Sequence, residues 1–288
     1  MIGPTHRRSI PAWLRPAPAV FMLAWGGNHF TPLLHLYEEL GHYDTGEANL
    51  LLGMYVVGLI PGLLLASALS DKYGRKPILL IGIGFAILGS ILLACGLDTF
   101  WLLCAGRTLA GVGVGVAMSV GTSWMKELSS VPFDLRAGRT AGARRPALTL
   151  TLGFGIGAAV TGALGQWGYA PTTTPYVLHV MLTLLALLAV LWTPESLGAE
   201  HRTTESWWRD LRVPAAGHRR FVRLVIPSAP WVFASAGIAY AVVPALVQDH
   251  LGRWTTLYAT ALAVLALGCG AVVQSFVPWI NRHTGGNA

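Results

Sequence analysis

The chain has 288 residues, of which 53% are hydrophobic and only 11% are charged, with 20 Lys and Arg against 13 Asp and Glu. Soluble globular domains carry about a quarter charged residues, so this composition excludes an ordinary soluble domain. A helix of about 20 apolar residues crosses the hydrocarbon core of a bilayer. In stretches of this length the apolar residues occur on all sides, which favours helices over the alternating strands of a barrel. The stretches cover residues 18–37, 48–70, 77–97, 99–123, 146–167, 175–193, 221–247 and 255–280.

These eight spans predict an all-α polytopic membrane protein. Of the 20 basic residues, 18 precede the first span or follow the second, fourth, sixth and eighth spans. The opposite loops hold only Arg253, and Arg107 lies inside the fourth span. This bias predicts that both termini are cytoplasmic, in a bacterial-type inner membrane. Because topology explains most of these charges, the net charge of +7 requires no nucleic-acid partner.

The seventh and eighth spans repeat features of the first and second. Pro32 and Gly41 at the outer end of the first span correspond to Pro244 and Gly252, at separations of 212 and 211 residues. A parallel repeat of six spans joined by a basic loop is one transporter layout. The domains expected are a cytoplasmic tail (1–17), an N-terminal six-helix bundle (18–193), a cytoplasmic linker (194–220) and an incomplete C-terminal bundle of two helices (221–288), with four spans missing.

The loop after the second span reads SALSDKYGRK from Ser67. Asp71 can accept hydrogen bonds from neighbouring donors, Gly74 permits a turn with positive φ, and Arg75 and Lys76 stay in the cytoplasm. An ordinary cytoplasmic loop would explain the basic residues but not the Asp and Gly at this spacing.

The fourth and fifth spans carry further signals. Arg107 is the only charge well inside a span, at a cost of about 2.5 to 3.5 kcal/mol on insertion scales, so it is expected to face a wet cavity or a partner. The alternative is an arginine that extends to the outer interface. Glycines at close spacing predict close helix approach, and the residues concerned are Gly111, Gly113, Gly115, Gly153, Gly157 and Gly162.

These segments resemble the major facilitator superfamily over nearly the whole chain. The Ser67 segment matches the signature G-x-L-x-D-R-x-G-R-R except for its first glycine, and LCAGRTLAGVGVG from Leu103 matches R-x-x-Q-G-x-G with Ala110 in place of Gln. GFGIGAAVTG from Gly153 resembles a motif of family exporters, but Ala158 replaces its proline. The resemblance implies that Asp71, Gly74, Arg75 and Lys76 form a conformational latch between the two halves.

The resemblance also implies a substrate path between the halves. Asn28 and His29 lie at membrane depth in the first span, where polar groups need partners or water, and Arg107 is a plausible neighbour. In the seventh span, Trp231 and Tyr240 offer aromatic surfaces to an organic substrate or to other helices. His29 could take part in proton coupling, although a lone histidine in a helix is more often structural.

The leading hypothesis is a secondary transporter of a small organic solute that works by alternating access, with efflux of drug-like or metabolic compounds as the first guess and protons as a candidate coupling ion. The alternative is a truncated remnant that inserts but does not transport. No enzyme is expected, because the sequence lacks a catalytic constellation and a phosphate-binding loop. Cys95, Cys104 and Cys269 have no metal-ligand spacing, so no metal or cofactor is expected and the partners are the lipid bilayer and the solute.

Overall fold

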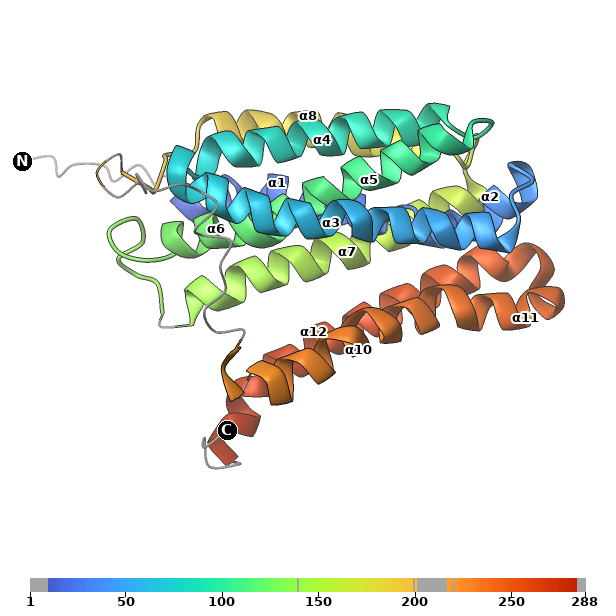
Figure 1. Ribbon diagram of the computed structural model, residues 1–288. Helices are drawn as coiled ribbons and strands as arrows, with labels where there is room; N and C mark the ends of the chain where they lie inside the picture. Colours follow the sequence, from blue (N-terminus) through green and yellow to red (C-terminus); the bar gives the residue numbers. More distant parts are fainter. Residues whose placement is uncertain (1–9, 139, 199, 201–216, 220, 284–288) are drawn as a thin grey trace, which may run out of the picture.

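The computed structural model describes residues 10–138, 140–198, 200, 217–219 and 221–283, without the side chains of some residues after 231. Every regular element in these ranges is helical, which confirms the all-α prediction (Figure 1). Residues 1–9, residues 201–216 of the predicted linker and the final residues 284–288 lie outside the described residues, and so do their arginines.

Six of the eight predicted spans appear as helical segments long and apolar enough to cross a membrane. They are α3 (Thr45–Tyr73), α4 (Arg75–Cys95), the segment Phe100–Leu128, α7 (Ala141–Trp167), α8 (Thr174–Leu191) and the segment Gly252–Val273 within η8 (Gly252–Trp254) and α12 (Thr255–His283). The Phe100–Leu128 segment comprises α5 (Phe100–Val116), a π-turn η3 (Ala117–Gly121) and α6 (Thr122–Leu128).

The first predicted span, 18–37, is not one uninterrupted helix. It consists of α1 (Ala17–Asn28), a 3-10 turn η2 (Thr31–Leu33) and the short α2 (Leu34–Leu40). Proline has no backbone N–H, so Pro32 cannot donate to the carbonyl of Asn28, where α1 ends. Pro32 entered the sequence prediction only as a repeat marker, and this break was missed.

The seventh predicted span is helical but irregular. It runs through the π-turn η6 (Phe221–Val225), α10 (Ile226–Gly237), the π-turn η7 (Ile238–Val242) and α11 (Val243–Leu251). Pro230 lies inside α10, and prolines within a helix remove a backbone donor and distort the hydrogen-bond ladder.

The first part of the chain forms a bundle in which α5 packs against both α3 and α4, while α1 packs against α7 and α8 (Figure 1). Glycines permit the closest approaches. A Cβ at Gly111 of α5 would overlap the carbonyl oxygen of Tyr55 in α3, and one at Gly58 of α3 would overlap that of Thr108. Backbones that approach this closely require small residues on both helices.

The other predicted packing glycines also lie at helix contacts. A Cβ at Gly113 would lie 3.2 Å from Ala86 of α4, and one at Gly115 would lie 2.6 Å from the backbone of Leu63 in α3. In α7, a Cβ at Gly153 would overlap the carbonyl oxygen of Phe21, and one at Gly157 would lie 2.8 Å from Trp25.

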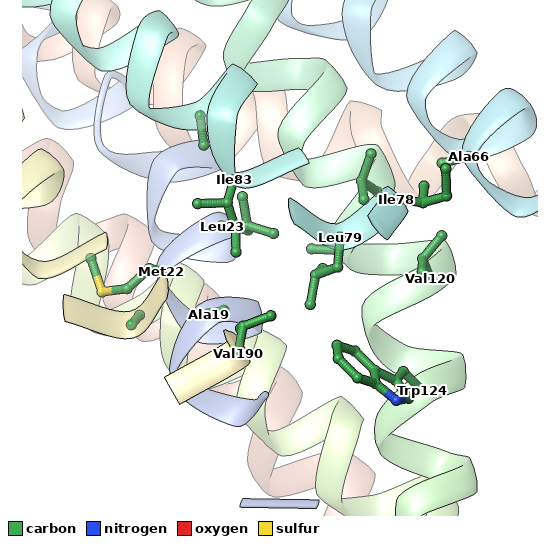
Figure 2. Packing of buried hydrophobic residues seen from close by; sticks show 14 of the residues in the cluster. Ala19, Met22, Leu23, Ala66, Ile78, Leu79, Ile83, Val120, Trp124 and Val190 are labelled. Atoms are coloured by element: carbon green, nitrogen blue, oxygen red, sulfur yellow. The ribbon is translucent and has the colours of Figure 1, made fainter. Parts of the chain in front are cut away.

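The apolar core of the bundle is largest toward the end at which α1 begins. Trp124 is fully buried, and its indole N–H donates to the carbonyl of Pro194 at 3.2 Å. Trp124 belongs to one cluster of buried side chains from α1, α3, α4, α6, α8 and the η3 turn (Figure 2), which also includes Ala19, Met22, Leu23, Ala66, Ile78, Leu79, Ile83, Val120 and Val190.

α12 packs directly against α7 and thereby joins the last helices to the bundle (Figure 1). A Cβ at Gly162 of α7 would overlap the side chain of Thr260, and the amide of Gln166 donates to the carbonyl of Arg253 at 2.9 Å. Residues from the two predicted bundles therefore share one interface.

Candidate functional site

Two polar clusters stand out in the bundle, one at its end and one in its interior. The end cluster begins at Gly74, which separates α3 from α4 with φ 103° and ψ 162°. A positive φ is readily accessible only to glycine, which is the conformation predicted from the sequence for this position.

Arg75 is the centre of the end cluster. Its Nη1 donates to Oδ1 of Asp71 and to the hydroxyl of Ser70, both at 2.6 Å, and its Nη2 donates to Oε1 of Glu127 at 2.9 Å. The Arg75 side chain is only 12% exposed, so these charge-assisted bonds are partly shielded from water.

Glu195, which follows α8, caps the start of α4. Its two carboxylate oxygens accept from the backbone N–H groups of Arg75 and Lys76 at 3.1 and 3.0 Å, where a helix N-terminus favours negative charge. The Lys76 ammonium donates to the carbonyls of Leu191 and Thr193 at 2.6 and 3.2 Å.

The four residues predicted as a latch therefore lie together, and their hydrogen-bond partners in the described part of the chain come from residues 70–196. Sequence reasoning missed Glu127 and Glu195. The signal for Glu195 was the Pro194-Glu195-Ser196 triplet, whereas Glu127 reads as an ordinary residue at a helix end.

The interior cluster contains Arg107 of α5, which is 1% exposed. Its guanidinium carbon lies 4.6 Å from the ring centre of Phe30, between α1 and η2, and 4.8 Å from that of Tyr55 in α3, so aromatic rings attract the charge from two sides. Nε donates to the carbonyl of Leu51 at 3.2 Å, but the buried Nη1 has no hydrogen-bond partner. Arg107 is therefore enclosed by protein groups, and the expectation that it has a partner at this position agrees with its contacts to Phe30, Tyr55 and Leu51.

Tyrosines link Arg107 to the histidines of the cluster. Phe30 stacks on Tyr37 with ring centres 4.8 Å apart, and the Tyr37 hydroxyl donates to that of Tyr176 at 2.9 Å. The ring of His29 packs edge-on against Tyr176, with centres 4.7 Å apart. This chain of contacts places α1, α2 and α8 around one buried site.

His29 is fully buried, and neither of its ring nitrogens has a hydrogen-bond partner. Its ring lies edge-on to that of His179 in α8, at 4.9 Å between centres. The neighbouring Asn28 donates from its amide to the carbonyl of Phe154 at 3.3 Å. Asn28, His29 and Arg107 thus lie in one region, as expected from the sequence.

His179 has every ring nitrogen satisfied, in contrast to His29. Nε2 lies 2.8 Å from the carbonyl of Met22 and Nδ1 lies 2.8 Å from the hydroxyl of Ser90. A carbonyl only accepts, so Nε2 carries the proton and Nδ1 accepts from Ser90. His179 therefore ties α8 to α1 and α4. Sequence reasoning missed it, although a histidine inside an apolar span was the same signal that singled out His29.

Trp231 is not brought to this cluster, contrary to the expectation that it lines the cavity. Its side chain is 68% exposed, because the contacts of α10 are mainly with η6 and η7, which directly precede and follow it in the chain, and only few are with the bundle. Tyr240 lies in η7, and its side chain is outside the described part of the structure.

A cavity of about 220 Å³ lies where α2 and the start of α3 meet η7, α11 and α12. Its wall is polar on the side of α2 and α3 and mainly apolar on the other side. Drug-sized ligands usually occupy pockets of roughly 300 to 1,000 Å³, so this one suits a smaller solute. Its lining comprises Thr31, Pro32, Leu34, His35, Glu38, Thr45, Asn49, Val242, Pro244, Ala245, Leu246, Thr255 and Ala259.

Comparison with curated proteins gives several relatives. The chain is 39% identical over 121 residues to a probable glucose transporter of Neurospora crassa, a match that covers 38% of this chain and 20% of that protein. It is 33% identical over 144 residues to the 3-(3-hydroxy-phenyl)propionate transporter of Escherichia coli (49% and 33% covered). It is 26% identical over 198 residues to the sugar transporter STL1 of Saccharomyces cerevisiae (62% and 32% covered). The matches therefore span a third or less of these relatives.

Among solved structures, the fold is similar to that of a double Trp mutant of XylE. The TM-score is 0.53 at 14% sequence identity, over 91% of this chain and 66% of the other. This likeness concerns the fold alone. The sequence model of the Major Facilitator Superfamily matches residues 17–287, which is nearly the whole chain. The chain, a multi-pass membrane protein, belongs to the Major Facilitator Superfamily.

Proposed function

We propose that this chain takes part in secondary transport of a small organic solute across a membrane, by alternating access, with the solute bound at the interior cluster of Asn28, His29 and Arg107. The observation that carries the proposal is this buried polar cluster inside an otherwise apolar bundle. Polar groups are expensive at membrane depth and generally mark a solute or ion path. Membership of a transporter family agrees with the expectation that the chain is not an enzyme.

The names of the relatives bear on the size and chemistry of the solute. Four of the relatives are described as transporters of glucose, sugar, inositol and 3-(3-hydroxy-phenyl)propionate, and one is described as a probable triacylglyceride transporter. The first four descriptions favour a small polar organic solute over a large drug-like compound. Efflux and proton coupling through His29 are separate hypotheses that the relatives do not support.

The test is a flux measurement in proteoliposomes that contain the purified chain. Radiolabelled glucose, inositol and 3-(3-hydroxy-phenyl)propionate are supplied outside, and the initial rate of uptake is compared with that of empty liposomes. We expect saturable uptake of at least one solute. Arg107→Gln should reduce the rate at least about tenfold, and Arg136→Gln should leave it unchanged. Absence of flux for all three would contradict the proposal and favour a chain that inserts without transporting.

Direction and coupling are tested in the same vesicles. If an inward proton gradient raises uptake by the parent chain but not by His29→Asn, proton coupling is supported. If preloaded vesicles release solute only when an inward proton gradient is present, efflux in exchange for protons is supported. Equal rates with and without the gradient would indicate facilitated diffusion.

The proposal places the chain in a bacterial-type inner membrane with both termini cytoplasmic, and it assigns a latch role to Asp71, Gly74, Arg75 and Lys76. The basic residues at the end formed by Arg75, Lys76, Lys126 and Arg145 support this orientation. Reporter enzymes that are active only outside the cytoplasm, fused after residue 98 and after residue 137, should be active at the first position and inactive at the second.

A further inference from the structure

We infer that the interior cluster binds the carboxylate of a small aromatic acid, with that carboxylate on Arg107. This inference rests on the proposed function and names the class of solute for the same site. The premise is that the buried basic side chains of the described residues have no buried acidic side chain beside them. The buried polar side chains of the described residues include Arg107, His29 and His179 but no aspartate or glutamate.

Arg107 consequently lacks a fixed anionic partner in the described part of the chain. Removing a guanidinium from water is costly unless an anion or several acceptors replace the hydration. Two aromatic faces and one backbone carbonyl provide part of that replacement. Nη1 remains as a buried donor without an acceptor.

The unused hydrogen-bonding capacity near Arg107 specifies the ligand. Arginine only donates, so its partner must accept, and a carboxylate accepts while also neutralising the charge. His29 offers two more unpartnered nitrogens in the same cluster, one of which can donate in the neutral ring. A neutral hydroxyl would satisfy Nη1 but would leave the charge uncompensated.

The remaining surface of the cluster is aromatic. Phe30 and Tyr55 cover the guanidinium, Tyr176 lies against His29, and the unpartnered indole N–H of Trp25 lies one helical turn before His29. Aromatic rings prefer offset or edge-on aromatic neighbours, so a ligand that carries a ring beside its carboxylate fits these walls better than a polyol. Because these polar atoms are buried in the present conformation, the acid reaches them only when the helices separate, as alternating access requires.

The experiment measures binding to the purified chain by isothermal titration calorimetry, with three probes of similar size. They are 3-phenylpropionate, its neutral amide 3-phenylpropionamide, and inositol, with chloride as a control for any small anion. The expected result is that 3-phenylpropionate binds at least about tenfold more tightly than its amide, since a hydrogen bond to a charged group contributes about 1.5 to 3 kcal/mol.

Variants assign the binding to Arg107. Arg107→Gln should weaken 3-phenylpropionate at least about tenfold and leave the amide nearly unchanged, while Arg107→Lys should recover part of the affinity because the charge remains but the planar fork is lost. Arg136→Gln removes the same charge from the loop after α6 and should bind like the parent chain. If Arg107→Gln fails to fold, the affinity of the parent chain for the acid relative to its amide still tests whether the site binds a carboxylate.

The outcomes separate the inference from the proposed function. Tighter binding of inositol or of the amide than of the acid would overturn the carboxylate assignment and leave solute transport intact. Equal binding of chloride and 3-phenylpropionate would show an unspecific anion site and would also overturn it. No binding of any probe, together with no flux of the three solutes named above, would remove the proposed function and the inference with it.

Discussion

Arg75 and Arg107 are both largely buried, yet their surroundings are opposites. Arg75, at the end of the bundle, pairs with the carboxylates of Asp71 and Glu127. Arg107, in the interior, has two aromatic faces, one carbonyl and an unpartnered Nη1. The first charge is neutralised by the protein itself, as a structural charge should be, whereas the second is left for something else to neutralise.

The arrangement around Arg107 depends on the close approach of α3 to α5. A substitution that forces these two helices apart should therefore have the largest effect on stability. Gly111→Leu would force its side chain into the carbonyl of Tyr55, the residue whose ring covers Arg107. We expect a loss of about 3 kcal/mol or more in the free energy of unfolding, because overpacking against backbone cannot be relieved by a rotamer change. The measurement is unfolding in detergent followed by tryptophan fluorescence.

Gly84→Leu is the matched control for Gly111→Leu. Gly84 lies in α4 and is exposed, and a Cβ at this position would meet no atom within 4 Å. Equal destabilisation by both substitutions would contradict a role for the close α3–α5 contact.

Arg75→Ala tests the other side of the comparison. It removes the cation between Asp71 and Glu127 and leaves the two carboxylates without a counter-charge, although the Ser196 hydroxyl still donates to Glu127. Because the Glu127 side chain is 33% exposed, we expect a loss of about 2 kcal/mol rather than the larger cost of breaking a fully buried pair. Unfolding in detergent gives the value, and a change as small as that of Arg136→Ala would argue against the network.

Arg107→Gln sharpens the comparison, since its effect on stability should be small. Replacing a buried charge that lacks an anionic partner relieves a desolvation cost while losing one bond to Leu51, so we expect a change within about 1 kcal/mol. The same unfolding assay measures it without ligand. A loss as large as that of Arg75→Ala would mean that Arg107 is a structural charge after all.

Asp134→Asn should have the smallest effect on stability, and this effect should depend on pH. The hydrogen bond from Arg145, at 2.8 Å, lowers the pKa of the Asp134 carboxyl. The unfolded pKa is about 3.9, so the pair stabilises the fold above that value and the contribution is lost as the pH falls through the lower folded pKa. Asp134→Asn should therefore cost about 0.5 kcal/mol at about pH 7 and less near pH 3, as measured by unfolding at both pH values. A cost that grows on acidification would contradict this assignment.

The positions of most spans could be predicted from the sequence because apolar length and flanking charge are local signals. Gly74 and Arg107 were also local signals, a turn glycine and a charge within an apolar run. The partners of these residues were not. Glu127 is 52 positions from Arg75, and Tyr176 is 139 positions from Tyr37, so only the packing of helices brings them together. The break in the first span was readable from Pro32, whereas the exposure of Trp231 depends on how α10 packs.

The interruption at Pro32 divides the first segment into two parts that are linked through Tyr37 of α2. The part before it carries Asn28 and His29 in the interior cluster, and the part after it carries His35 and Glu38 in the wall of the small cavity. Since one backbone hydrogen bond is already absent between them, α2 can tilt with less resistance than a segment within a continuous helix. Because Tyr37 of α2 stacks on Phe30 and bonds to Tyr176, a tilt of α2 would change the mouth of the cavity and the aromatic surroundings of Arg107 together.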